Sequence, residues 1–373
     1  MKRFLALALV VFGLAACQND PEVINPVGGE VDYELTVAAP ELGTTRAVTG
    51  MDSAQGAIDN FDDALIWDTA DLRYILEIYN ADEDGEGTDI TLVKERMVQV
   101  VDKYEPVVFK FRIIPGRTYK FVVFADLVAE GDKQAQYNPA GGVVAEGLRH
   151  VIGSTLADIT VKEDDINDEY GDAYFISKNI EINNALQQSL ELTRPYAKLR
   201  VITTDMDELN LDVQPGYVVV TYDVDQPTSF NAINGKISTT PGTKSFDFTY
   251  EMDGDNKVIR PYTAGKDAVN SSIQNLEAKL SNMTLFTDYV LAVDEEKPTK
   301  FRMDVYEDVA MNSPIKSNYF STDIPLRRNY LTTIIGNVLT TASEVEITID
   351  NKFVNEGVED DNHYIEVWVG MYN

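Results

Sequence analysis

Side chains that commonly carry chemistry are scarce in this sequence, except for carboxylates. The 373 residues contain one cysteine, Cys17, and two histidines, His150 and His363, against 62 Asp and Glu residues. Neither histidine has the spacing of a zinc site or of a His-based catalytic triad, and we expect His150, beside Arg149, to lie at the surface. No glycine-rich phosphate loop is present. The inventory predicts no cofactor and no enzyme, although residue order cannot show whether two carboxylates face each other as in a glycosidase.

Cys17 ends a segment with the features of an export signal. Lys2 and Arg3 precede the apolar run 4–14, which is too short for a transmembrane helix of about 20 residues. Leu14-Ala15-Ala16-Cys17 follows and resembles the lipobox of bacterial lipoproteins. That resemblance implies cleavage before Cys17 and acylation of its sulfur and its new amino group, so that outer-membrane lipid holds the chain. The alternative is a chance cysteine after an ordinary signal peptide.

The remaining chain is acidic and large enough for two domains. The formal net charge of the whole sequence is −31, and 44% of its residues are hydrophobic. So acidic a chain repels nucleic acid, and we expect no nucleic-acid partner. With a single cysteine the chain cannot form an intrachain disulfide, so its stability must come from packing and sheet pairing.

Short runs rich in Val, Ile, Tyr, Phe and Thr predict an all-β fold. The clearest run is 31–39, where one face of the expected strand carries Val31, Tyr33, Leu35 and Val37. Runs 107–114 and 118–127 are separated by Pro115-Gly116, and we expect them to form a hairpin. We expect further strands at 72–79, 197–204, 217–224, 244–250, 289–293, 300–305, 330–340, 345–349 and 364–371.

The density of these short strands predicts two tandem β-sandwich domains with minor helices. Helical segments are expected only at 54–64 and 268–280. The expected divisions are a signal peptide at 1–16, a lipidated linker at 17–30, a first domain at 31–190 and a second domain at 191–373.

Besides the lipobox, four segments of the chain resemble sequences of a known family. They are Thr44-Thr45-Arg46-Ala47, residues 119–126, residues 194–200 (RPYAKLR) and residues 325–337 (PLRRNYLTTIIGN). Together they resemble the fimbrillin-type lipoproteins of Bacteroidetes, and the last two segments are the most specific. The resemblance implies transthyretin-like β-sandwiches and a structural or adhesive role in cell-surface fimbriae. It also implies an outer-membrane, surface-exposed location and other fimbrial subunits as partners, in homo- or heteropolymers.

The same resemblance implies proteolysis between Arg46 and Ala47, which would remove the lipid and the first strand together. The small residues around Arg46 suit an accessible loop. Losing the four apolar side chains of the first strand would forfeit roughly 6 to 12 kcal/mol, which rivals the stability of a whole domain. The exposed groove would then need a strand from a neighbouring subunit. The alternative is that Arg46 is an ordinary loop arginine.

The C-terminal residues offer a candidate donor strand. Apolar side chains occupy alternate positions at Ile365, Val367, Val369 and Met371. The alternative is that this segment is the last strand of its own domain. A second hypothesis for the whole protein is a lipid-retaining fimbrial anchor, or a surface lipoprotein that binds a glycan or a host protein. Such a protein would keep residues 17–46, whereas a polymerising subunit would lose them.

Two acidic segments have compositions that could suit a metal site. Asp82 to Asp89 has a calcium-loop composition, but the twelfth position of an EF-hand would be Val93, so we interpret the segment as a solvated turn. Asp253-Gly254 is interpreted as a hairpin turn. We expect no metal site. Asp52-Ser53-Ala54 and Asp68-Thr69-Ala70 resemble the O-glycosylation motif of the same phylum.

Overall fold

The structure is a computed structural model, and it shows a protein built of β-sheets. It describes residues 29–40, 70–87, 90–102, 105–131, 145–162, 172–183, 187–203, 205, 217–242, 245–252, 258–261, 283–307, 310–340, 345–351 and 365–367. Within these residues every regular element is a strand, which confirms the predicted all-β fold of β-sandwiches. The two expected helical segments lie outside the described residues. No helix of the described part is long and apolar enough to cross a membrane.

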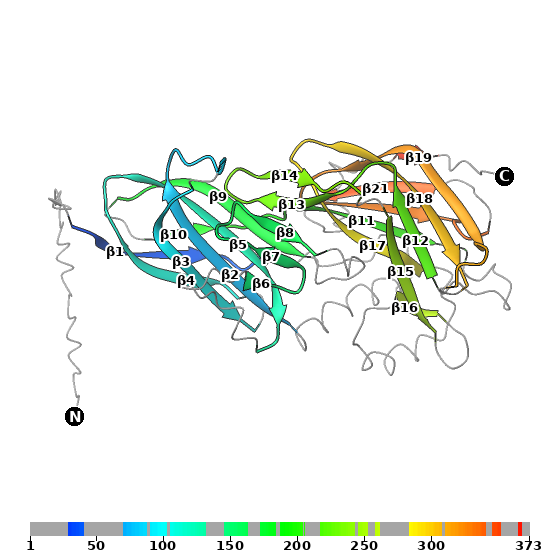
Figure 1. The fold of residues 1–373 in the computed structure, drawn as a ribbon, viewed down its shortest axis with the longest axis horizontal. Helices are drawn as coiled ribbons and strands as arrows, with labels where there is room; N and C mark the ends of the chain where they lie inside the picture. Colours follow the sequence, from blue (N-terminus) through cyan, green and yellow to red (C-terminus); the bar gives the residue numbers. More distant parts are fainter. Residues whose placement is uncertain are drawn as a thin grey trace, which may run out of the picture.

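Two sheets at one end of the molecule form the first sandwich (Figure 1). Sheet A has the order β10 (Gln187–Leu190), β1 (Val31–Val37), β4 (Val107–Ile113). Sheet B has the order β3 (Leu92–Val101), β2 (Ala70–Asn80), β5 (Thr118–Ala129), β9 (Ala173–Glu181). Apolar side chains from both sheets form one core. The outward face of sheet A is in water, whereas β2 and β5 are buried on both faces, which explains their nearly continuous apolar sequences.

Two further sheets form the second sandwich at the other end (Figure 1). Sheet D has the order β17 (Met283–Leu291), β11 (Tyr196–Thr203), β20 (Tyr330–Gly336), β21 (Val345–Asn351), β22 (Ile365–Val367). Sheet E has the order β16 (Val258–Pro261), β15 (Ser245–Met252), β12 (Tyr217–Tyr222), β18 (Lys297–Tyr306), β19 (Lys316–Leu326). A separate core lies between them. The predicted hairpin turn at Asp253-Gly254 lies outside the described residues, and the strands before and after it, β15 and β16, pair antiparallel.

A fifth sheet joins the two sandwiches. Sheet C has the order β14 (Lys236–Thr239), β13 (Pro227–Asn231), β8 (Ile159–Val161), β7 (His150–Ile152), β6 (Ala145–Glu146). Its strands come from both halves of the sequence, and they meet where β8 pairs antiparallel with β13. A third core packs side chains of sheet C against sheet B and against side chains of β11, β17 and β20 in sheet D. We call the region of sheet C and this third core the junction.

The predicted hairpin of residues 107–127 is wrong. β4 pairs with β1 in sheet A, whereas β5 pairs with β2 and β9 in sheet B. The turn at Pro115-Gly116 therefore carries the chain from one sheet of the sandwich to the other. Gly116 has a φ of 73°, and its N–H donates to the carbonyl of Ile182 at 2.8 Å. The predicted turn at Pro115-Gly116 is present, but a turn alone does not show which strands pair.

The predicted domain boundary at residue 190 stays a prediction. β10 ends at Leu190 in sheet A, and β11 begins at Tyr196 in sheet D. Sheet C nevertheless takes strands from both sides of that position, so the two halves are not joined by the chain alone.

Candidate functional site

The first strand is the middle strand of sheet A. β1 pairs antiparallel with β4 along all of Val31–Val37, and parallel with β10 from Glu34 to Val37. The pairing with β10 continues past the strand, because the N–H of Ala38 donates to the carbonyl of Leu190 at 2.8 Å. Among the described strands, neither β4 nor β10 has any other neighbour in its sheet. β1 therefore holds sheet A together.

The inward face of β1 is fully buried over three residues. Tyr33, Leu35 and Val37 are 1%, 0% and 0% exposed, and all three belong to the core of the first sandwich. The ring of Tyr33 lies 5.5 Å from that of Phe111, centroid to centroid. Val31 is only half-buried, so the sequence-based count of four buried apolar side chains was one too high. The alternation itself places the inward residues as predicted.

These contacts make the loss of β1 costly. Each large apolar side chain contributes about 1.5 to 3 kcal/mol when buried, so Tyr33, Leu35 and Val37 together stabilise the sandwich by roughly 5 to 9 kcal/mol. That amount is comparable with the whole free energy of unfolding of a typical domain, about 5 to 15 kcal/mol. The backbone groups of β4 and β10 that now bond to β1 would also lose their partners. The rest of the sandwich needs a strand in this position.

The structure does not bring the other predicted site residues to β1. Cys17, Arg46 and Ala47 lie outside the described residues, as do the candidate donor residues Val369 and Met371. The remaining two donor candidates, Ile365 and Val367, belong to β22, which pairs with β21 at the edge of sheet D. The described part of the proposed donor strand therefore already has a place in the second sandwich.

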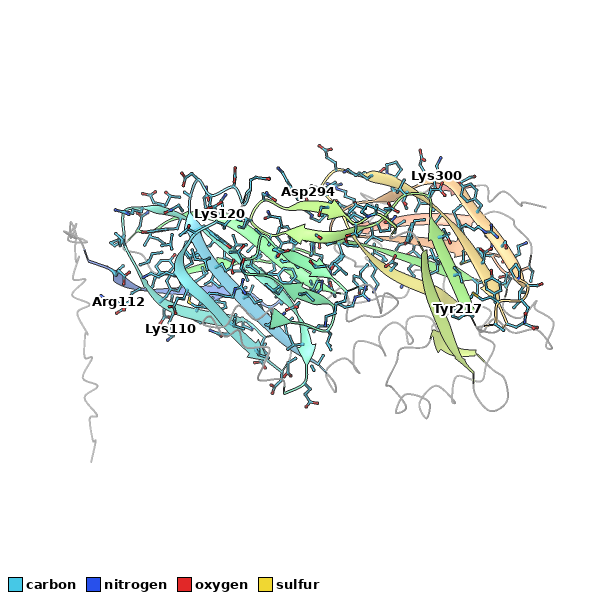
Figure 2. The ribbon with its side chains drawn as sticks, viewed as in Figure 1. Lys110, Arg112, Lys120, Tyr217, Asp294 and Lys300 are labelled. Atoms are coloured by element: carbon cyan, nitrogen blue, oxygen red, sulfur yellow. The ribbon has the colours of Figure 1, made fainter. Side chains whose placement is uncertain are left out.

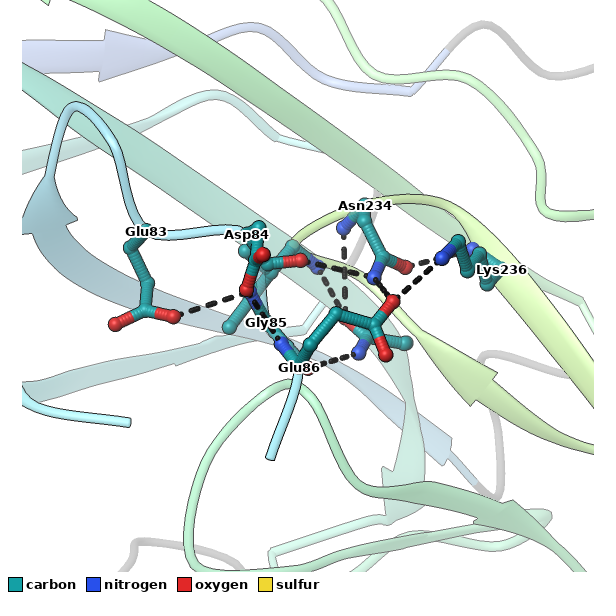
Figure 3. A network of polar contacts seen from close by, with 8 residues as sticks. Glu83, Asp84, Gly85, Glu86, Asn234 and Lys236 are labelled. Carbon is teal, nitrogen blue, oxygen red and sulfur yellow. Dashed lines mark hydrogen bonds and ion pairs between the residues drawn. The ribbon is translucent and has the colours of Figure 1, made fainter. Parts of the chain in front are cut away.

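The acidic segment after β2 contacts the second half of the chain (Figure 3). Asn231 Nδ2 donates to the carbonyl of Gly85 at 2.8 Å, and Asn234 Nδ2 donates to that of Asp84 at 2.9 Å. Lys236 forms an ion pair with Glu86 at 2.5 Å. Gly85 has a φ of 74°, and a Cβ built on it would lie 2.9 Å from the Ile233 Cβ. The segment is a docking turn of the junction.

A buried ion pair lies on the face of sheet B that points to the junction. Arg73 on β2 and Asp126 on β5 face each other in register, with bonds of 2.8 Å from Nε and 2.7 Å from Nη2. His150 is 1% exposed, and its Nε2 lies 2.5 Å from the Tyr196 hydroxyl on β11. The prediction that His150 is a surface residue is wrong, because its ring packs against Phe124 and Tyr196 at the junction.

Each of the two most specific segments of the fimbrillin resemblance has some residues at the junction and others in the core of the second sandwich. In the first segment, Arg194 donates from Nε to both oxygens of Asp172, at 2.9 and 3.0 Å. In the second, Arg328 Nη2 donates to the carbonyl of Gly235 on the β13–β14 turn at 2.5 Å. Asn329, at a left-handed φ of 64°, donates from its N–H to the carbonyl of Tyr196 at 2.7 Å. Of these contacts, only the Arg194–Asp172 pair joins the two halves of the sequence, because the other two lie within the second half.

Burial shifts the titration of two groups near the junction. It raises the pKa of the Asp288 carboxyl to about 6, although a hydrogen bond from the Tyr222 hydroxyl at 2.6 Å opposes that shift. Burial, and then the nearby Arg149 charge, holds the pKa of His150 well below its usual value. Within the described residues, no group of three or more His, Cys, Asp or Glu side chains is placed to hold a metal ion.

Sequence reasoning missed the positive side chains that face β1. Lys110 and Arg112 on β4 lie opposite Glu34 and Asp32, and Lys94 on β3 contacts Glu30. The alternation of Lys110, Phe111 and Arg112 was a usable signal. Its meaning depends on the pairing of β4 with β1, which the expected hairpin had hidden.

The fold defines a class of two-sandwich, all-β proteins whose halves share a bridging sheet. The chain belongs to a family described as a family of unknown function (DUF6562), whose model matches residues 25–367. No curated protein has a matching sequence.

Three solved structures illustrate the structural likeness. A candidate cell adhesion protein of Bacteroides uniformis is 13% identical, with a TM-score of 0.41 over 88% of this chain and 99% of that one. A candidate polysaccharide binding protein of Bacteroides thetaiotaomicron is 11% identical, with a TM-score of 0.39 over 89% and 100%. A fimbrial assembly protein of Parabacteroides distasonis is 11% identical, with a TM-score of 0.39 over 90% and 98%. All three TM-scores are below 0.5, so this likeness supports no statement about the function of this chain.

Proposed function

We propose that this chain is a non-enzymatic structural or adhesive subunit of cell-surface fimbriae, exported as a lipoprotein on Cys17 and activated by cleavage after Arg46. The observation that carries the proposal is the position of β1 between β4 and β10 in sheet A. Both neighbours turn backbone N–H and C=O groups toward β1, so only another strand can take its place. The fimbrillin motifs in the sequence support the same role.

The order of residues along the chain suits such an activation step. Cys17 precedes β1 and Arg46 follows it, so one cut at Arg46 separates both the lipid and β1 from the rest of the protein. The cut product keeps sheet B and the junction, which do not include β1. A neighbouring subunit then supplies the missing strand of sheet A, and repetition of this step forms a polymer on the outer membrane.

The test is the mature form of the protein on its native cells. The protein is recovered from the cell surface, and its intact mass and N-terminal sequence are measured for the wild type and for Arg46→Ala. Arg117→Ala is the matched control, because Arg117 is an exposed arginine in the turn after β4. Cys17→Ser identifies the mass that lipid contributes.

A wild-type chain that begins at Ala47 is the expected result. Arg46→Ala should then keep an acylated Cys17 and form no high-mass, detergent-resistant polymer, whereas Arg117→Ala should behave as the wild type. If all forms begin at an acylated Cys17, the cleavage mechanism is wrong. The protein would then be a lipid-retaining anchor, or a surface lipoprotein that contacts a glycan or a host protein.

A further inference from the structure

The outward face of β1 carries carboxylates that pair with cations on the neighbouring strand. Glu34 lies directly opposite Lys110 on β4, and their charged atoms are 2.9 Å apart. Asp32 lies directly opposite Arg112, at 3.7 Å. Opposite charges in cross-strand positions favour one register of pairing over its neighbours. The outward residues therefore add a charge pattern to the apolar pattern of the inward face.

A third cation extends this pattern. Lys94 on β3 contacts the carboxylate of Glu30, just before β1, and Arg112 Nη2 donates to the carbonyl of Glu30 at 2.9 Å. We call Lys94, Lys110 and Arg112 the basic stripe. Its three cations meet three carboxylates at alternate positions of residues 30–34. Figure 2 places Lys110 and Arg112 at the end of the molecule that carries β1, far from Lys300 on the second sandwich.

The stripe is unusual for this chain because the chain as a whole is acidic. With 31 Lys and Arg against 62 Asp and Glu, the net charge of −31 makes two copies repel each other. Removal of β1 would take the carboxylates of Glu30, Asp32 and Glu34 away from the stripe. The open groove would then be lined by apolar side chains on its inward side and by Lys110 and Arg112 on its outward side, with Lys94 of sheet B at the end where Glu30 had been, and it would attract an acidic strand.

We propose that the basic stripe selects the strand that fills the groove. The partner is a strand of a neighbouring subunit, with apolar side chains at the positions of Tyr33, Leu35 and Val37. It carries carboxylates at the outward positions that Glu30, Asp32 and Glu34 now occupy. This inference rests on the proposed function, because it needs β1 to leave. It adds the chemistry of the partner, which the apolar pattern alone does not specify.

The C-terminal strand of this chain fits that chemistry poorly. The outward positions between Ile365 and Met371 are Glu366, Trp368 and Gly370, so only one of the three carries a carboxylate. Its described part is also paired with β21. The basic stripe therefore favours a donor strand richer in carboxylates than residues 365–371.

The experiment measures peptide binding to the full chain carrying Cys17→Ser and cut at Arg46 by an Arg-specific protease. One fluorescent peptide has the sequence of residues 29–38, a second carries Gln, Asn and Gln in place of Glu30, Asp32 and Glu34, and a third has the sequence of residues 364–371. The uncut chain is the negative control. The cut chain is also tested with Lys110→Gln and Arg112→Gln together, and with Lys300→Gln, a matched strand lysine that pairs with Asp323.

The acidic peptide should bind about 10-fold more tightly than the neutral peptide at low salt, and the ratio should fall below about 2 in 1 M salt because the charges are exposed. The double variant should lose the preference, and Lys300→Gln should keep it. Equal affinities at low salt, or tighter binding of the C-terminal peptide, would overturn the selection while leaving strand exchange intact. Binding of no peptide to the cut chain would overturn both proposals.

Discussion

β1 and the junction differ in how many independent contacts depend on one element. Sheet A depends on a single strand, because β4 and β10 pair only with β1 among the described strands. At the junction the two halves are joined by a shared sheet, by a third core and by several independent polar contacts. Loss of any one junction contact leaves the others in place. Loss of β1 would therefore leave the contacts between the two halves in place.

The largest expected loss in the free energy of unfolding comes from breaking the buried ion pair on the junction face of sheet B. Asp126→Asn takes the carboxylate from the buried Arg73, and breaking one side of such a pair costs about 3 to 5 kcal/mol. We expect denaturant unfolding to show this loss in one transition that includes both sandwiches. The double variant Arg73→Met with Asp126→Leu should recover most of the stability. Two separate transitions would contradict the picture of a shared junction.

A cavity made in the core beside β1 should destabilise sheet A more than sheet B. Leu35→Ala removes a fully buried side chain from the core of the first sandwich and should lower the free energy of unfolding by about 3 kcal/mol. We expect hydrogen exchange to accelerate in β1, β4 and β10, while the amides of β2 and β5 keep their protection. Equal acceleration in sheet B would show that sheet A cannot open alone. Val108→Ala, at an exposed position of β4, is the control.

The titration of Asp288 gives a pH-dependent test inside the second sandwich. In the folded protein this carboxyl binds a proton up to about pH 6, whereas in the unfolded chain it ionises near 3.8. Its contribution to the free energy of unfolding therefore falls as the pH rises from about 4 to 6. Relative to the wild type, Asp288→Asn should become more stable over that range by about 2 to 3 kcal/mol. Asp323→Asn, at an exposed position, should show no such change.

The smallest expected effect concerns the docking turn. Gly85 and Gly87 both have a positive φ, but only a Cβ at Gly85 would meet Asn231 and Ile233. Gly85→Ala should therefore cost about 1 to 2 kcal/mol more than Gly87→Ala, since the strained φ is common to both and only Gly85 becomes overpacked. Thermal unfolding of the two variants measures the difference. Equal costs would mean that the turn does not fit closely against the second half.

Local patterns predicted the strands better than their partners. The alternation of residues 31–37 identified β1, and its inward residues are those the pattern named. The hairpin of β4 and β5 failed because a turn signal acts over a few residues, whereas pairing depends on the burial of whole faces. β4 has one face in water and β5 has none, so they belong in different sheets. That contrast was visible in the two sequences.

The junction was hidden for a related reason. β13 and β14 are short and polar, and they form a sheet only with strands that lie far away in the sequence. His150 was expected at the surface because its neighbour is charged. Its burial depends on Asp126 and Tyr196, which no local pattern connects with it. The basic stripe was missed because its meaning depends on the register between β4 and β1.

In the polymer proposed above, sheet C would also have a mechanical consequence for a subunit that is pulled from both ends. Tension that enters through the groove of sheet A and leaves through the second sandwich crosses the junction, where β8 and β13 lie side by side and bear the load together with the packed rings of Phe175 and Phe230. The covalent link between β10 and β11 does not carry that load alone. Under force the halves should move as one stiff body, and the contact between one subunit and the next should yield first.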